Sequence, residues 1–174
     1  DTLRKSSIKL GLDLQGGVDF LLAVDRDRVL QAQLDNTADE IRRDFARDKN
    51  NIPASITTDY ETMEIVIRLD DKKDAEVARA ALEKFENYFD PPNYQQLETG
   101  TLRLRANVRN LEQHLRETVD GALRVVRKRV DEFGLTQPVV ARQGLDRIRV
   151  QIPGETDPEK IERNLLRPAT LEFR

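Results

Sequence analysis

Apolar residues recur with two different periods along this chain. Residues 8–14, IKLGLDL, alternate apolar with polar or small side chains, and a period of two predicts a strand with one buried face. After the pair Gly16-Gly17, residues 18–24 form an almost continuous apolar run. Such a run is typical of a strand that is covered on both faces. The two glycines permit a sharp bend or a bulge between these strands.

A period near 3.6 predicts four helices. Their apolar positions recur at spacings of three and four within residues 30–45, 78–89, 111–133 and 161–166. The longest helix has Asn110 as its expected N-cap and Gly134 at the position that follows its last turn. Gly121 inside it costs about 1 kcal/mol relative to alanine, which suggests close packing of a neighbour there. Asp157-Pro158 predicts a cap followed by a first-turn proline.

Alternating segments between these helices predict the remaining strands. They span residues 52–60, 63–69, 102–106, 139–141 and 148–152, with a weaker strand at 94–97 and a last one at 171–173. The order is then β-α-β-β-α-β, twice. This order predicts an α+β protein of two ferredoxin-like units, each a four-stranded antiparallel sheet with helices packed on one face. The pattern alone favours tandem units, residues 16–100 and 101–174.

Composition narrows the class of protein. The 174 residues are 38% apolar and 35% charged, which suits one or two domains with buried cores. A formal net charge of −3 argues against nucleic acid or anionic lipid as a partner. No apolar run approaches the ~18–20 residues that cross a bilayer. Without cysteine, the chain has neither disulfides nor thiolate metal ligands.

The residues that could carry out catalysis do not form a known catalytic set. His114 is the single histidine, so a zinc site would need carboxylates for all its other ligands, which is unusual. Asp13 and Asp19 flank the paired glycines, yet no nucleophile or second base lies near them in the sequence. We expect Asp13 to accept hydrogen bonds from turn amides instead. We therefore expect no enzymatic activity, no metal and no cofactor.

Two other motifs also favour structural roles. The glycines around Gly11 and Gly16 lack the lysine and the Ser/Thr of a phosphate-binding loop, and a strand follows them where such a loop needs a helix. The basic residues at positions 124 and 127–129 lie on a predicted helix, where Asp120, Asp131 and Glu132 neutralise much of their charge. We interpret them as a solvated helix face.

Three segments resemble one known family. Residues 11–18, GLDLQGGV, are similar to the signature at the start of the first periplasmic domain of SecD protein-translocase subunits, a family of RND-type transporters. Residues 127–154, RKRVDEFGLTQPVVARQGLDRIRVQIPG, resemble the second signature of that family. The closing residues 169–174, ATLEFR, are also similar to it. The three segments follow the order of the family.

The resemblance implies a function that the residues alone do not. The chain would be the base portion of that periplasmic domain, in a multi-pass parent of the bacterial inner membrane, with residues 1–7 leading from the first membrane span. Its partners would be SecF, the SecYEG channel and unfolded preprotein, which the parent helps to translocate and release with the proton gradient. The chain itself would be a non-catalytic platform for a mobile, substrate-binding head.

The resemblance also implies a domain division and a set of motif residues. It favours a ferredoxin-like base of residues 1–25 and 108–174, with 26–107 as an inserted subdomain. We expect hinges at Gly16-Gly17 and just after Phe173, because hinges absorb backbone rotation at the ends of elements. The motif and hinge residues that it implies are Gly11, Asp13, Gly16, Gly17, Gly134, Gly144, Pro153 and Gly154.

Two alternative functions remain open at this point. An uncovered sheet face could bind RNA, with Phe20 as the aromatic residue on a strong strand. Paired ferredoxin-like units could instead bind a small molecule, which would raise thermal stability.

Overall fold

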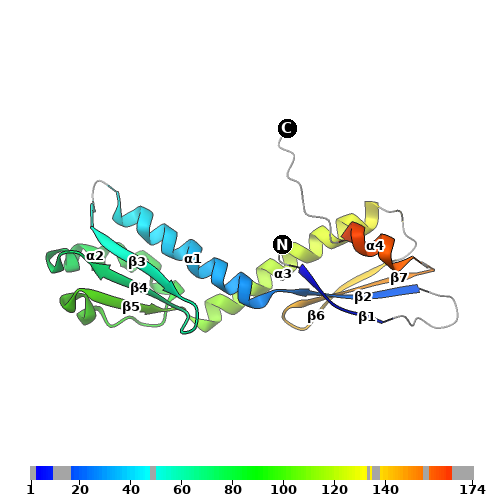
Figure 1. Cartoon of the computed structure of the whole chain (residues 1–174), viewed down its shortest axis with the longest axis horizontal. Coiled ribbons are helices and arrows are strands. Elements are labelled where there is room, and N and C mark those ends of the chain that lie inside the picture. The colour runs from blue at the N-terminus through cyan, green and yellow to red at the C-terminus, as the bar shows by residue number, and fades with distance from the viewer. Residues whose placement is uncertain are drawn as a thin grey trace. The chain divides into compact units, whose positions relative to one another are not determined.

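Two compact units make up the described part of the chain (Figure 1). The structure, a computed structural model, describes residues 3–9, 17–47, 50–132, 134, 138–154 and 157–165. Unit 1 contains the described residues of Asp1–Val29 and Leu115–Arg174, and unit 2 is Leu30–His114. Each unit has one antiparallel sheet together with helices, so the predicted α+β class is confirmed.

Unit 1 is built on a sheet with the strand order β1-β2-β7-β6. Its strands are β1 (Leu3–Lys9), β2 (Gly17–Val24), β6 (Val139–Gln143) and β7 (Arg147–Pro153). Its helices are α4 (Pro158–Leu165) and the greater part of α3 (Val108–Glu132). All neighbouring strands are antiparallel.

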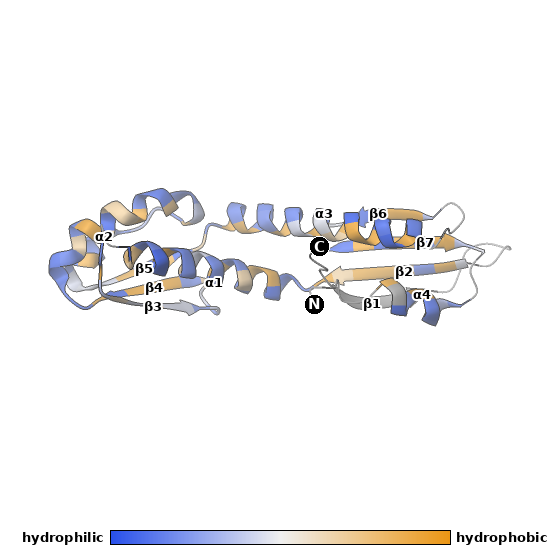
Figure 2. Ribbon diagram, turned by 90° about the horizontal axis from the view of Figure 1, so that it is seen from above, coloured by the Kyte–Doolittle hydropathy of each residue, from blue (hydrophilic) through white to orange (hydrophobic). Residues whose placement is uncertain are grey.

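The core of unit 1 lies on one face of this sheet. Alternate residues of β2 and β7 pack there against the apolar side chains of α3 and α4, in a cluster that includes Phe20, Val119, Val126, Ile148 and Ile161. Figure 2 shows the mostly apolar colouring of β2. Leu21 and Ala23, which point to the other face, are only half-buried. The apolar run therefore predicted a strand correctly, but helices of the core cover it on one face.

The start of the chain differs from the sequence prediction. Leu3–Lys9 form β1, which pairs with β2 with a register shift between Lys5 and Ser7. Residues 1–7 were expected to lead from a membrane span, and the structure places residues 3–7 of that segment in a strand. The physical reason is that β2 offers backbone hydrogen-bonding groups on the side away from β7, and β1 satisfies them. The predicted strand over residues 8–14 is described only as far as Lys9.

Unit 2 is built on a sheet with the order β3-β4-β5. Its strands are β3 (Ala54–Asp59), β4 (Glu64–Leu69) and β5 (Thr101–Arg105). Its helices are α1 (Arg26–Phe45), which begins in unit 1, and α2 (Ala75–Leu82). Three 3-10 helices complete it: η1 (Lys72–Asp74), η2 (Glu83–Tyr88) and η3 (Tyr94–Thr99). Residues of both helices and of one sheet face form a second core, which includes Leu34, Ile41, Ile65, Leu82 and Leu102.

The weak strand predicted at residues 94–97 is wrong. These residues lie in η3, where the Asn93 side chain accepts a hydrogen bond from the Gln95 N–H at 3.2 Å. Gly100 then ends the turn with a φ of +86°. This local capping competes with pairing to a strand. The described sheet of unit 2 therefore has three strands instead of the predicted four.

Two predictions about α3 also change. The helix begins at Val108, and Asn107 caps it by accepting hydrogen bonds from Arg109 N–H and Asn110 N–H at 3.0 and 3.3 Å. Asn110 is therefore not the cap. A Cβ placed on Gly121 would meet only the Arg124 side chain, at an ordinary 3.8 Å. Close packing does not explain this glycine. The predicted cap at Asp157 is confirmed, since it accepts from Lys160 N–H at 3.0 Å.

Candidate functional site

The sheet of unit 1 brings the two long signature segments together. In the antiparallel register of β2 with β7, Gly17 lies opposite Pro153 and Val18 opposite Ile152. Residues that are far apart in the sequence thus become neighbours on adjacent strands. We call this end of the sheet the motif end, defined by Gly17, Asp19, Gln151, Pro153 and Gly154.

The motif end accommodates Pro153 without losing a bond of the ladder. The Val24 N–H donates to the Asp146 carbonyl at 2.7 Å, and hydrogen-bonded pairs alternate along antiparallel strands. By this alternation Gly17 and Pro153 form a pair without mutual backbone bonds. On the other side of β7, the strand β6 begins at Val139, opposite Gln151. The position therefore suits a residue that has no N–H.

A charged cluster lies next to this pair on the sheet face away from the core. Asp19 is buried, with 8% of the residue exposed. The Arg149 Nε lies 3.1 Å from each of its oxygens, and the Gln151 Nε2 lies 3.3 Å from Oδ2. The hydrogen bonds and the negative charge of Asp19 raise the pKa of the Arg149 guanidinium. This ion pair therefore joins two strands, and the guanidinium stays protonated at ordinary pH.

The other predicted motif residues are not gathered at this end. Gly144 lies in the turn between β6 and β7, next to the Gln143–Arg147 pair at the opposite end of the sheet, with a φ of +69°. Gly134 follows α3 with a φ of +61°. Gly11, Asp13 and Gly16 lie outside the described residues, as does the bend expected after Phe173. Gly154, which does belong to the motif end, follows β7 with a φ of +74°. Sequence reasoning placed Asp19 beside the glycines but could not identify its partner.

The structure changes the interpretation of Phe20. Its ring is 1% exposed and belongs to the core of unit 1. Strand alternation puts it on the same face as Val18 and Leu22, against the helices. The RNA-binding alternative needs an exposed Phe20 for stacking on a base, and the buried ring counts against that alternative.

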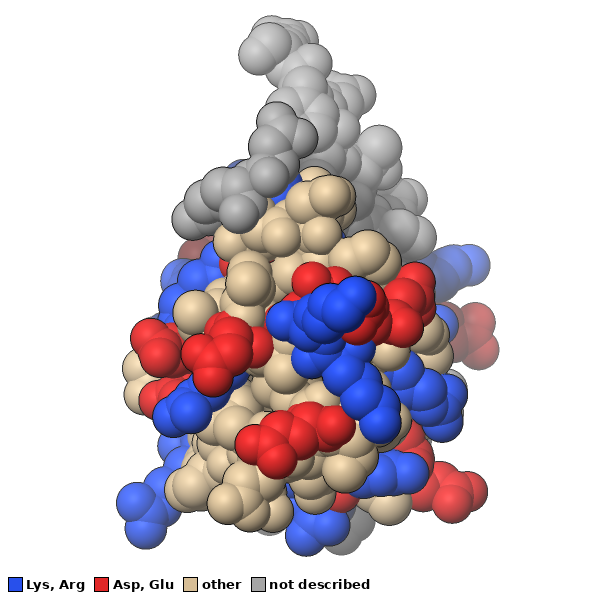
Figure 3. All heavy atoms as spheres, turned by 90° about the vertical axis from the view of Figure 1, so that its left-hand side faces the viewer, with Lys and Arg blue, Asp and Glu red and all other residues tan. Residues whose placement is uncertain are grey.

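The described residues give two further findings about sites. Within them, no group of three or more His, Cys, Asp or Glu side chains is arranged to hold a metal ion. Among the described helices, none combines the length and the apolar character that crossing a bilayer requires. Figure 3 shows acidic and basic side chains interspersed over one face of unit 2.

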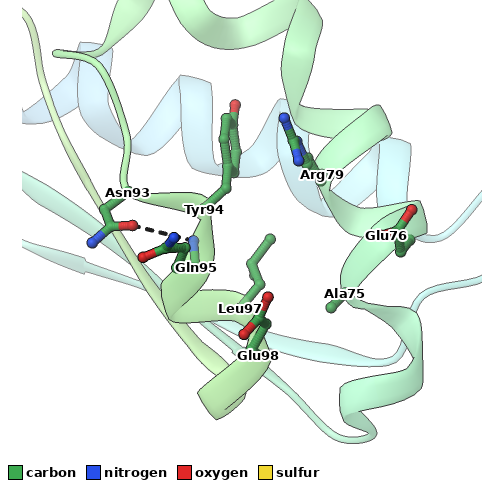
Figure 4. A pocket seen from close by; sticks show the side chains of 8 residues that line it. All are labelled: Ala75, Glu76, Arg79, Asn93, Tyr94, Gln95, Leu97 and Glu98. Carbon is green, nitrogen blue, oxygen red and sulfur yellow. Dashed lines mark hydrogen bonds between the residues drawn. The ribbon is translucent and has the colours of Figure 1, made fainter.

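Unit 2 has a polar pocket of about 450 Å³ between α2 and η3 (Figure 4). The Arg79 Cζ lies 5.4 Å from the ring centroid of Tyr94, and the Tyr94 hydroxyl lies 3.2 Å from Glu86 Oε1. Burial, followed by this hydrogen bond and the charge of Glu86, raises the pKa of Tyr94 to about 12. The volume is within the range of small-molecule sites, but the lining mixes both signs of charge. Binding of a small molecule stays a prediction.

Comparison with known proteins gives a consistent result. Residues 119–174 match the family model described as "Protein translocase subunit SecDF, P1 domain, N-terminal". The chain is similar to the protein translocase subunits SecD of Rickettsia conorii, Rhodothermus marinus and Escherichia coli. The identities are 31%, 33% and 36%, over 98%, 99% and 96% of this chain and 32%, 26% and 26% of those proteins. No solved structure matches the chain significantly.

These findings define the class as an α+β segment of a protein translocase subunit. The chain belongs to the SecD family, as its signature segments indicated. It spans about a third of the length of the first relatives that it matches.

Proposed function

We propose that this chain is the base portion of the first periplasmic domain of a SecD-type subunit. The observation that carries the proposal is the pairing of β2 with β7, because it joins the two signature segments in one sheet. The two signature segments are more than a hundred residues apart in the sequence, yet they pair on adjacent strands. This arrangement suits two segments that act together as one mechanical element. The parent would lie in the bacterial inner membrane, with this segment on its periplasmic side.

The base would consist of residues 1–25 and 108–174, and residues 26–107 would be an inserted subdomain. Three features support this division. β2 pairs with β7, α3 supplies the core of the same unit, and the three strands of unit 2 pair only with one another among the described residues. The insertion would therefore add a second small core without interrupting the first.

The base would act as a non-catalytic platform for a mobile head that holds unfolded preprotein. It would work with SecF and the SecYEG channel in the late, proton-gradient-driven stage of translocation. The hydrogen-bonded ion pair of Asp19 and Arg149 supports a structural role for the motif end. A platform needs a fixed sheet with bends at its ends, and Gly16-Gly17 at the start of β2 would be one such bend.

The test is a pulse-chase export assay in cells that depend on the full-length parent. Gly16→Pro together with Gly17→Pro should slow the export that depends on the proton gradient, because proline fixes φ at both positions. The matched control is Gly121→Ala, a glycine in α3 where a Cβ fits; it should leave export unchanged. Normal export by the proline variant, at a normal protein level, would contradict the proposed hinge.

A further inference from the structure

The outer edge of β3 has backbone groups that the rest of unit 2 does not use. β3 pairs only with β4 in the described sheet, so its other side is an edge. The Asp70 N–H donates to the Pro53 carbonyl at 3.1 Å. Continuing the alternation along the register, the backbone groups of Ala54, Ile56 and Thr58 point away from β4. An edge of this kind is a template for another strand.

One of these outward groups, the Ile56 carbonyl, accepts hydrogen bonds from a side chain that can be displaced. The Arg42 side chain on α1 donates from Nη2 and Nε to the Ile56 carbonyl at 2.7 and 3.2 Å. Its side chain is 43% exposed, so it can move into solvent at low cost. For the N–H groups of Ile56 and Thr58, no partner is found in the described part of the chain. The edge is therefore protected at one carbonyl and open beside it.

A groove of about 350 Å³ lies beside the start of this edge and extends along β3 as far as Ile56. The last turn of α1 and the residue after it line one side with Arg42, Phe45 and Ala46. The segment before β3 and the start of β3 line the other, including Pro53 and Ala54. Figure 2 places β3 at the outside of its sheet. An edge strand beside a helix, with a groove between them, is the arrangement by which several domains add a peptide as an extra strand.

We propose that the β3 edge binds an extended segment of unfolded polypeptide by strand addition. Backbone N–H and C=O groups that alternate along an edge are complementary to an extended main chain, whatever its side chains. Alternate side chains of the added strand would enter the groove beside α1. This inference rests on the proposed function, since it names the kind of substrate that the inserted subdomain would hold.

A second copy of this chain fits the edge less well. Pairing two β3 strands antiparallel about Ile56 would bring two Arg42 guanidinium groups to the same pair of carbonyls. Like charges directly opposed at an edge disfavour pairing. A foreign peptide brings no such charge, and it can displace Arg42 from the Ile56 carbonyl. The occupant that we infer is therefore an unfolded polypeptide.

The probe is a fluorescein-labelled peptide of about ten alternating Thr and Val residues with terminal lysines, a typical strand length. Its affinity for the whole chain is measured by fluorescence anisotropy. Thr58→Pro removes an outward N–H at a strand edge, where proline is tolerated. It should weaken binding at least about tenfold, the equivalent of one or two main-chain hydrogen bonds. Thr58→Val is the matched control, because both variants lose the Thr58 hydroxyl bond to Asp35 and only proline loses the N–H.

A second probe separates strand addition from binding by side chains. The same peptide with an N-methyl group on every residue should not bind, since neither of its edges then has N–H donors. Because the chain has no cysteine, a photocrosslinker on Thr57→Cys in β3 should capture the peptide, and one on Thr101→Cys in β5 should not. Circular dichroism checks that each variant is folded.

Several results would overturn the proposal. They are no binding by the unmodified chain, equal binding by Thr58→Pro and Thr58→Val, or equal capture at both crosslinking positions. Sedimentation that gives a dimer, lost in Thr58→Pro, would assign the edge to a second copy instead. Each of these results leaves the export test of the Gly16-Gly17 bend unaffected, so failure of this site is distinguishable from failure of the proposed function.

Discussion

The Asp19 carboxylate of β2 accepts hydrogen bonds from the Arg149 guanidinium of β7 diagonally across the two strands. Asp19 lies directly opposite Gln151, and Arg149 lies opposite Leu21. The ion pair therefore connects two cross-strand pairs that are neighbours on one face of the sheet, Asp19 with Gln151 and Leu21 with Arg149. Its position next to Gly17 and Pro153 fixes the register where the two signature segments meet.

Removing one side chain of this ion pair should lower the Tm more than removing the other. The side chain of Arg149 is 48% exposed and that of Asp19 is 10% exposed. Arg149→Ala leaves a buried carboxylate, whereas Asp19→Ala leaves a guanidinium that water can reach. We expect Arg149→Ala to lower the Tm by roughly 2–4 °C and Asp19→Ala by less, as measured by calorimetry. The double variant should be no worse than Arg149→Ala, and additive losses would show that the two side chains are not coupled.

Two glycine-to-alanine changes should have opposite signs. Gly154 has a φ of +74°, and a Cβ there costs about 1 kcal/mol because of the backbone conformation. Gly121 lies within α3 with room for a Cβ, so Gly121→Ala should raise the free energy of unfolding by roughly 1 kcal/mol. Urea denaturation measures both. Gly154→Asn should recover part of the loss, since asparagine tolerates positive φ. Equal effects at the two positions would contradict this assignment.

Tyr94 should lose its proton at a higher pH than an ordinary tyrosine. Its pKa is raised to about 12, so the folded chain holds this proton while the unfolded chain loses it near pH 10. Stability from this group is complete below about pH 10 and is lost as the pH rises through about 12. Because the ring is partly exposed, we expect a loss of no more than ~1 kcal/mol. Ultraviolet titration should show a late tyrosinate step that is absent in Tyr94→Phe.

Core burial in unit 1 predicts a large difference between two residues of the same sheet. Phe20 is 1% exposed, and Phe20→Ala should lower the free energy of unfolding by about 3–5 kcal/mol. Val139 is 51% exposed, and Val139→Ala should change it by no more than about 0.5 kcal/mol. Denaturant unfolding compares them. A small loss for Phe20→Ala would mean that its ring is not in the core.

Local pattern was sufficient for most elements of this fold. A continuous apolar run predicted β2, and alternation predicted β4 and β7. The spacing of Leu34, Ala38 and Ile41 predicted α1, because each pattern records which side chains one element buries. It failed at Tyr94–Thr99, where the Asn93 cap and Gly100 favour a 3-10 turn over a strand. It also placed the cap of α3 at Asn110 instead of Asn107.

The sequence identified some residues of the candidate site but not how they are arranged. The resemblance identified Gly17, Pro153 and Gly154 as motif residues, but it could not tell that Gly144 lies at the opposite end of the sheet. The partner of Asp19 lies 130 residues away, beyond any local signal. The β3 edge had no sequence signal either, because an edge is defined by the strand that is missing beside it.

By itself, the sequence determined the α+β class, the positions of most helices and strands, and the SecD family. These properties depend on side-chain periodicity and on motifs that are short and contiguous. Only the tertiary structure decided that β2 pairs with β7, that Asp19 is bound to Arg149, and that β3 ends its sheet. Strand pairing depends on which backbones approach each other across long stretches of chain, and backbone hydrogen-bonding groups are the same in every residue except proline.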